Sequence, residues 1–180
     1  ERDRLDGLNR PSHFGDSHEE RLYNVALELC ITWINRILFL KLMESQLVMY
    51  HKGDQTYRFL DTKTVSNYDA LESLFFGVLA KRLENRNERY KEKYAKVPYL
   101  NSSLFEPTGL EGGVFSVTQL NNNLEHELYS RTVLKDANGK SLSGKIDTLE
   151  YLFRFLEAYD FSSEGNEEIQ EESKSLINAS

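Results

Sequence analysis

Cysteine, proline and long apolar runs are all scarce in this chain, and the shortages of cysteine and of apolar runs each exclude a class of protein. Of the 180 residues, one is cysteine and three are proline. A single cysteine, Cys30, excludes an internal disulfide and fits a reducing compartment. The richest apolar segment, residues 30–43, is interrupted by Asn35, Arg36 and Lys41, so it predicts a buried helix rather than a membrane span. The charged start carries no signal peptide, and we expect a cytoplasmic protein without membrane contact.

The short motifs of common catalytic, metal and cofactor sites are also missing. The sequence holds no Walker A, GxSxG or dinucleotide-binding glycine pattern, and the cluster Gly109, Gly112 and Gly113 is a weak signal by itself. The four histidines form neither an HxH nor an HExxH pattern, and they stand apart at His13, His18, His51 and His126. We therefore expect no metal site, cofactor site or catalytic residue within this chain.

One sharper pattern has the residue order of a metal-dependent nuclease site. Asp160 is followed by Glu172-Ser173-Lys174, and such sites hold a divalent metal between two carboxylates beside a lysine. Here the residues fall in a polar, glutamate-rich run that favours a solvated helix. We interpret the order as a coincidence of composition.

Composition and charge predict one globular domain of ordinary size. The chain is 39% hydrophobic and 28% charged, with a net charge of −7, and its length suffices to bury a core. The acidic balance argues against a main DNA-binding surface and predicts weak or absent DNA binding by this segment alone. The alternative is DNA binding through a local basic face at residues 81–96. We expect a polar lead-in arm over residues 1–16 and a single helical domain over residues 17–180. Since the sequence does not begin with methionine, we expect a fragment of a longer chain.

Apolar periodicity predicts three helices. Ser17 and Glu20 have capping-box spacing and open a long spine helix that runs to about Met49. Its apolar face is predicted to comprise Leu22, Val25, Ala26, Leu29, Trp33, Ile37, Leu40 and Leu47. A second helix starts after Ser66 or Asn67, with an apolar stripe that extends to Leu83. A third covers residues 148–159 and is opened by Asp147 and Glu150, which repeat the capping spacing.

The remaining segments predict short β elements and connections. Residues 132–145 read as a β-hairpin with a tight turn at Asn138-Gly139. Short strands are possible at residues 56–60 and 114–117, and the rest divides between a weak helix or turn over 119–129, a charged helix or linker over 84–96 and an acidic helix over 166–179. The predicted fold class is mainly α: a helical domain with one long spine helix and small β-hairpin elements.

The stretch VPYLNSSLFEP, residues 97–107, fits neither an amphipathic helix nor an alternating strand. Two of the three prolines bracket it, and proline fixes the backbone dihedral φ. The expected signature residues are Pro98, Tyr99, Asn101, Leu104 and Phe105, with the last two anchoring the loop in the core and Asn101 accepting a turn conformation. We interpret the loop as a rigid brace between domains; direct contact with cofactor or DNA is the alternative.

Five segments together resemble a known region of large bacterial enzymes. They occur in the order FFGVLAKRLENR, VPYLNSSLFEP, TVLKDANGKSLSGK, TLEYLFRFLEAYDFSSEG and EEIQEESKSLINAS. In this order they resemble the region before the catalytic domain of adenine-specific DNA methyltransferases, namely Type IIG restriction–modification enzymes and relatives in bacteriophage-exclusion systems. The resemblance covers residues 22–180, and PYLNSSLFE and the final LINAS are its most specific parts. Members of that family often carry Asn-Gly-Gly where this chain has Asn101-Ser102-Ser103.

The resemblance implies a parent enzyme that transfers a methyl group from S-adenosylmethionine to N6 of a flipped-out adenine in DNA. Its cofactor loop and its (Asn/Asp/Ser)-Pro-Pro-(Tyr/Phe) motif are absent here, since the chain contains no Pro-Pro. We therefore expect a non-catalytic helical segment that braces or connects a methyltransferase domain downstream of residue 180, with DNA bound through the parent protein. The alternative is a helical protein–protein adaptor with no methyltransferase module; a self-sufficient enzyme is the least favoured.

Overall fold

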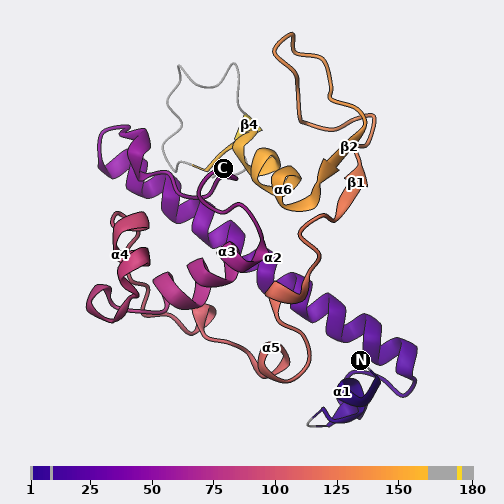
Figure 1. Ribbon diagram of the computed structural model, residues 1–180. Helices are drawn as coiled ribbons and strands as arrows, with labels where there is room; N and C mark the ends of the chain where they lie inside the picture. The colour runs from indigo at the N-terminus through magenta and orange to yellow at the C-terminus, as the bar shows by residue number, and fades with distance from the viewer. Residues whose placement is uncertain (1, 9, 162–173, 176–180) are drawn as a thin grey trace. The chain divides into compact units, whose positions relative to one another are not determined.

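The computed structural model describes residues 2–8, 10–161 and 174–175, and the described chain is mainly helical (Figure 1). Its α-helices are α1 (Arg2–Asp6), α2 (His18–Tyr50), α3 (Tyr68–Glu72), α4 (Glu88–Lys93), α5 (Gly109–Gly113) and α6 (Thr148–Glu157). Its strands are β1 (Glu125–Glu127), β2 (Lys145–Asp147), β3 (Tyr159–Asp160) and β4 (Lys174–Ser175). The predicted fold class, mainly α with one long helix and a small antiparallel β pair, is confirmed.

The chain divides into two compact units. One contains residues 1–39 and 71–120, and the other contains residues 40–70 and 121–180. Helix α2 passes from the first unit to the second between Phe39 and Leu40. Each unit is described by itself below.

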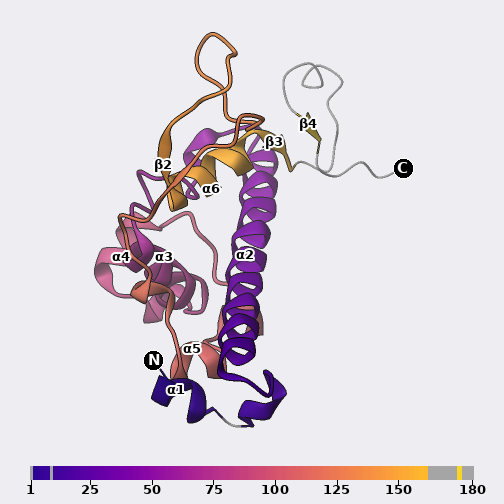
Figure 2. The ribbon, with the colours of Figure 1, turned by 90° about the vertical axis from the view of Figure 1, so that its right-hand side faces the viewer.

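Helix α2 begins with the predicted capping box and spans 33 residues, about 50 Å (Figure 2). Ser17 Oγ accepts a hydrogen bond from Glu20 N–H, and Glu20 Oε2 accepts one from Ser17 N–H at 3.1 Å. Hydrogen bonds from the Ser17 and Asp16 amides lower the pKa of the Glu20 carboxyl. Of the predicted apolar face, Leu22 and Ala26 are exposed, because they border an open pocket instead of packing against another element.

The second predicted helix begins where expected, in the second unit, and ends early, in the first unit. Helix α3 starts at Tyr68, where Asn67 Oδ1 accepts from Ala70 N–H, and it continues as a π-helix over Ser73–Leu79. Leu83 therefore lies beyond the helix and is exposed, contrary to the predicted apolar stripe. The charged stretch 84–96 contains α4. The strand expected at 114–117 is absent, because the amides of Val114 and Phe115 both bond the carbonyl of Leu110, in the first turn of α5.

In the second unit, α6 begins at the predicted cap, while the strands lie outside the predicted hairpin except for Lys145, its last residue. Asp147 Oδ1 accepts from the amides of Leu149 and Glu150 at 2.9 and 3.0 Å. Strands β1 and β2 pair antiparallel, with His126 opposite Ile146. Between them, residues 132–144 hold a single bridge, from Lys135 to Ser141, around the Asn138-Gly139 turn. The prediction of a helix or turn throughout 119–129 is therefore wrong at β1.

A buried carboxylate explains why residues 56–60 form no strand. Glu44 Oε2 accepts from the amides of Phe59 and Leu60, both at 2.7 Å. Those amides are thereby withheld from a β partner. Glu44 Oε1 accepts from Lys41 Nζ at 2.9 Å. Lys41, one of the charged residues that interrupt the apolar segment 30–43, is therefore itself buried and paired.

The predicted acidic helix over 166–179 and the LINAS segment lie almost entirely outside the described residues. The exception is β4, which pairs in parallel with β3, so Lys174 and Ser175 are strand and not helix. Among the described residues, no helix is both long and apolar enough to span a bilayer.

Candidate functional site

The loop of residues 97–107 runs extended around a short 3-10 turn at Ser103–Phe105 in the first unit. Of its predicted signature residues, Phe105 is fully buried, Pro98, Tyr99 and Leu104 are half-buried, and Asn101 is exposed. The loop thus has a buried end and a middle that faces solvent. Its two ends are held by two buried arginines that come from different parts of the unit.

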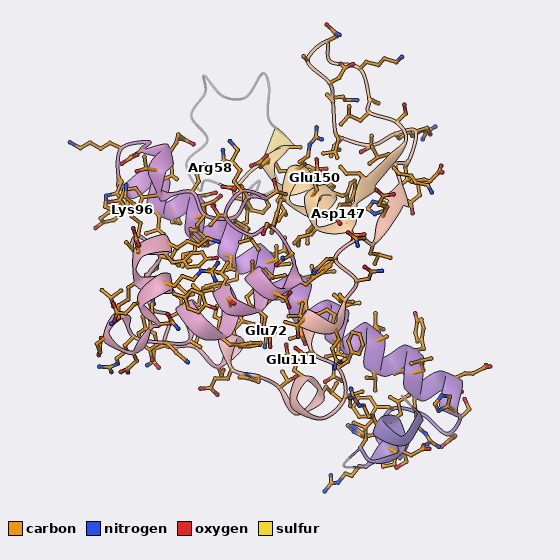
Figure 3. All side chains as sticks on the ribbon, viewed as in Figure 1. Arg58, Glu72, Lys96, Glu111, Asp147 and Glu150 are labelled. Carbon is orange, nitrogen blue, oxygen red and sulfur yellow. The ribbon has the colours of Figure 1, made fainter. Side chains whose placement is uncertain are left out.

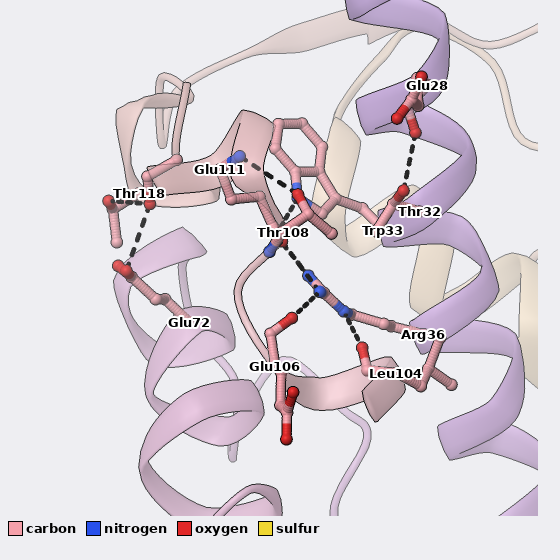
Figure 4. Close-up of polar contacts among 11 residues, drawn as sticks. Glu28, Thr32, Trp33, Arg36, Glu72, Leu104, Glu106, Thr108, Glu111 and Thr118 are labelled. Atoms are coloured by element: carbon pink, nitrogen blue, oxygen red, sulfur yellow. Dashed lines mark hydrogen bonds and ion pairs between the residues drawn. The ribbon is translucent and has the colours of Figure 1, made fainter. Parts of the chain in front are cut away.

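Arg36 of α2 holds the end of the loop that follows the 3-10 turn (Figure 4). Its side chain is only 1% exposed. Nε donates to the carbonyl of Leu104 at 2.6 Å, and Nη2 donates to the carbonyl of Glu106 at 2.9 Å. The same guanidinium donates from Nη1 and Nη2 to the carboxylate of Glu111. One planar side chain therefore joins α2, the loop and α5.

Glu111 supplies the countercharge, and the local structure of α5 positions it. Thr108 caps α5: its hydroxyl accepts from Glu111 N–H, while Glu111 Oε2 accepts from Thr108 N–H at 2.8 Å. Trp33 Nε1 donates to Glu111 Oε1 at 3.0 Å. Burial alone would raise the pKa of Glu111, but the hydrogen bonds from Arg36, Thr108 and Trp33 outweigh it, and the pKa is lowered. The carboxylate is thus held ionised opposite Arg36.

Arg86 holds the other end of the loop through backbone carbonyls. It is 3% exposed. Nη1 donates to the carbonyls of Val97 at 2.8 Å and Tyr94 at 3.3 Å, and Nε donates to Val78 and Lys81 at 3.1 and 3.2 Å. Within the described part of the chain it forms no ion pair. Burial lowers the pKa of Arg86, and four carbonyl dipoles take the place of a carboxylate. It joins the end of the π-helix to the start of the loop.

Phe105 packs the loop onto the same aromatic cluster that covers Arg36. Its ring centroid lies 6.0 Å from the rings of both Phe39 and Phe75. The Arg36 guanidinium lies over Phe75 and Phe76, at 5.4 and 5.2 Å from their centroids. Such stacking is favourable for a desolvated guanidinium. The aromatic anchor and the arginine therefore stabilise one loop conformation together.

The middle of the loop has few contacts with the rest of the unit. Tyr99 O–H donates to Asn101 Oδ1 at 3.1 Å, and Ser102 Oγ accepts from Leu104 N–H at 3.2 Å. Leu100 N–H reaches the carbonyl of Leu79 at 2.9 Å. Residues 101–103 are exposed. A fixed loop with a solvent-facing tip is a geometry suited to contact with another molecule or domain.

Sequence reasoning found the loop but missed the groups that hold it. Arg36 had a signal: it falls among Trp33, Ile37 and Leu40, on the buried face of the helix, where a cation requires a partner. Glu111 had only the capping spacing from Thr108. Arg86 had none, since it stands in a stretch of mixed charge that reads as solvated.

An apolar pocket lies beside the Arg36 centre. It has a volume of about 250 Å³ and shares Trp33 with that centre. Its other walls come from α1, α2 and the segment after α5, including Leu5, Val25, Leu29 and Phe115. Helix α1 thus packs through Leu5, although the sequence predicts only a polar arm there.

The described residues contain no group of three or more histidine, cysteine, aspartate or glutamate side chains placed to hold a metal ion. The pattern Asp160…Glu172-Ser173-Lys174 is not placed by the structure: its side chains lie outside those it describes.

These observations define a mainly helical protein whose candidate site is a loop fixed at both ends by buried arginines. The chain belongs to the family described as domain of unknown function DUF7814, whose profile matches residues 1–177. No curated protein and no solved structure matches the chain.

Proposed function

We propose that the chain is a non-catalytic helical segment of an adenine-specific DNA methyltransferase or restriction–modification enzyme, and that it braces or connects the S-adenosylmethionine-dependent catalytic domain. In this proposal the methyltransferase domain follows in the same polypeptide and the parent protein binds DNA. The loop 97–107 is the contact surface. Pro98, Tyr99, Asn101, Leu104 and Phe105 either form or position that surface.

The observation that carries the proposal is the construction of the loop. Its most specific stretch of resemblance, PYLNSSLFE, coincides with the segment between the Arg86 and Arg36 contacts. A surface loop without a partner needs no such fixation, since ordering its backbone costs about 1–2 kcal/mol per residue. Fixing its ends while exposing residues 101–103 lowers the entropy lost on docking and so favours a stable interdomain contact.

The proposal is tested on the full polypeptide that contains these residues. Purified protein is incubated with labelled S-adenosylmethionine and unmethylated bacterial DNA, and the product is analysed for N6-methyladenine. We expect methyl transfer by the unmodified protein. A protein that folds and transfers no methyl group to any DNA offered, with a downstream sequence that lacks the Pro-Pro-containing motif, would refute the proposal.

The role of the loop is tested by Asn101→Ala and Asn85→Ala in that polypeptide. Both side chains are exposed in the first unit, so neither substitution is expected to change stability. Asn101→Ala should lower methyl transfer several-fold, while Asn85→Ala should not. Equal activity of the two variants would remove the loop tip from the interface.

The second candidate is a helical protein–protein adaptor, and one feature of α2 favours it. Tyr23, Leu27, Ile31 and Ile34 are 44–67% exposed, and their spacing of four, four and three residues places them along one side of the helix. The described chain leaves this apolar side uncovered, which is typical of an interaction surface. A stable complex with one specific partner, formed by a polypeptide without a methyltransferase module, would support the adaptor.

A further inference from the structure

A polar hollow lies in the second unit between the segment after β1 and the last turn of α6. Its volume is about 480 Å³, and it is lined by Arg131, Thr132, Val133, Leu134, Lys135, Arg154, Glu157 and Ala158. We call it the 131–135 pocket. Three of its eight lining residues are basic and one is acidic, in a chain whose net charge is −7. The local charge is thus opposite to that of the chain.

The two carboxylates of α6 beside the pocket are already paired with arginines, and Asp136 next to Lys135 accepts from the backbone amides of Asn138 and Lys140. Glu157 Oε1 accepts from Arg58 Nη2 at 3.0 Å, and Glu150 Oε1 accepts from Arg154 Nη1 at 3.3 Å. Arg58 and Glu150 are labelled in Figure 3. Arg131 forms no side-chain hydrogen bond or ion pair with the described residues, and Lys135 Nζ donates only to the hydroxyl of Ser141, at 2.7 Å. Two cations therefore share one hollow without a carboxylate partner in the described chain.

The backbone that carries these two cations is fixed. Thr132 and Leu134 between them are buried, and Thr132 Oγ1 accepts from Leu134 N–H at 3.2 Å. The carbonyl of Leu134 accepts from Leu142 N–H at 3.0 Å. Since alternate residues of the segment point inward to the core, Arg131 and Lys135 are held on the solvent side. Their proximity is imposed by the fold and not by a partner.

We propose that the 131–135 pocket binds a phosphate group. Arg131 would supply the planar fork that matches phosphate oxygens, and Lys135 a compact second charge. The carboxyl end of α6 opposes this with a partial charge of about −0.5, which the positive charge of Arg154 in the last turn offsets in part. The unpaired positive charges of Arg131 and Lys135 therefore favour binding of an anion. The site stands on the second unit alone, so it is independent of the proposed bracing function of the loop.

A phosphate group can come from a nucleic-acid backbone or from a free nucleotide, and the chemistry of the pocket is shared by both. The first experiment uses inorganic phosphate alone. Backbone amide resonances of the full chain are followed by NMR as phosphate replaces chloride at constant ionic strength. We expect saturable shifts that are confined to residues 131–135 and 154–158.

The matched variants separate the pocket from the general surface. Arg131→Gln with Lys135→Gln removes both unpaired cations, while Arg89→Gln with Lys63→Gln removes the same charges from exposed sites elsewhere. The pocket variant should weaken phosphate binding by at least about ten-fold, as expected for the loss of charge-assisted hydrogen bonds. The control variant should bind as the unmodified chain does. Equal urea midpoints of all three proteins establish that the fold is intact.

A second arm identifies the source of the phosphate. Labelled duplex DNA, single-stranded DNA and adenosine monophosphate are titrated at several salt concentrations. If the chain binds DNA, the logarithm of the binding constant falls linearly with the logarithm of the salt concentration. A slope that is smaller in the pocket variant by about 0.7–0.9 per lost phosphate contact assigns the pocket to a nucleic-acid backbone. Binding of the nucleotide without DNA binding supports the pocket and assigns it to a free ligand. No shift with inorganic phosphate, or equal losses in the pocket and control variants, would overturn the proposal.

Discussion

Replacement of Arg36 by methionine tests whether the buried ion pair determines the stability of the first unit. Methionine keeps an unbranched chain but removes all four donated hydrogen bonds, which reach Glu111 and the carbonyls of Leu104 and Glu106. Removing one partner of a buried pair leaves the other charge uncompensated and costs about 3–5 kcal/mol. That is a large share of the 5–15 kcal/mol by which domains of this size are stable. We therefore expect a severe loss of stability for Arg36→Met.

The assay is urea denaturation followed by the fluorescence of Trp33, the single tryptophan. Because Trp33 donates to Glu111, its emission reports on the centre that is perturbed. With a slope of about 2 kcal/mol/M, the expected loss lowers the urea midpoint by about 1.5–2.5 M. Lys91→Met is the control: it removes a surface pair with Glu88, which is worth only about 0.2–0.5 kcal/mol.

A double-mutant cycle isolates the pair. Glu111→Gln removes the charge and retains one oxygen acceptor, which can serve either the Trp33 donor or the Thr108 donor, because these two bond different carboxylate oxygens. In the Arg36→Met/Glu111→Gln protein no buried charge is left alone, so the double variant should be less destabilised than the sum of the single variants, by at least about 1 kcal/mol. Additive losses, or a loss for Arg36→Met no larger than that for Lys91→Met, would refute the reasoning.

Three further predictions concern the loop and its partners. Arg86→Met leaves four carbonyl groups without their donor and should lower the free energy of unfolding by at least about 2 kcal/mol; a loss below 0.5 kcal/mol in the same fluorescence assay would contradict this. Phe105→Ala removes a fully buried ring and should cost about 3–5 kcal/mol, whereas an intact midpoint would show that the loop is not anchored there. The lowered pKa of Glu111 stabilises the fold above the unfolded pKa of about 4.3, and this stabilisation is lost as the pH falls through the folded pKa. The stability difference between the unmodified chain and Glu111→Gln should therefore be largest near neutral pH and shrink in acid; a difference independent of pH would contradict it.

The parts of the fold that sequence predicted are those set by neighbouring residues. The start of α2 follows from the Ser17–Glu20 spacing, and the start of α6 follows from Asp147. Both signals act within four residues, where side chain and backbone meet whatever the rest of the chain does. The predicted fold class was right for the same reason, since helical periodicity is local.

One misplaced element is the strand expected at residues 56–60, where a distant side chain takes the backbone groups. Glu44 binds the amides of Phe59 and Leu60 across about 15 residues of sequence and so prevents a strand. The hairpin was centred correctly on Asn138-Gly139, but only one bridge forms beside the turn, and pairing resumes at Lys145. The sequence pattern and the turn residues locate such a turn. The pairing register of the two strands depends instead on which residues, such as Ile146, are buried.

The use of arginine at both ends of the loop bears on what the loop is for. A buried ion pair contributes little net stability compared with apolar side chains of similar volume, because desolvation offsets the attraction. Arginine differs from an apolar anchor in that its donors are directional: Arg36 requires the carbonyls of Leu104 and Glu106 at fixed positions, and Arg86 requires that of Val97. Apolar packing by Phe105 alone would tolerate several backbone paths between these points. The two arginines therefore select one path, as the proposed interdomain contact of the loop would require.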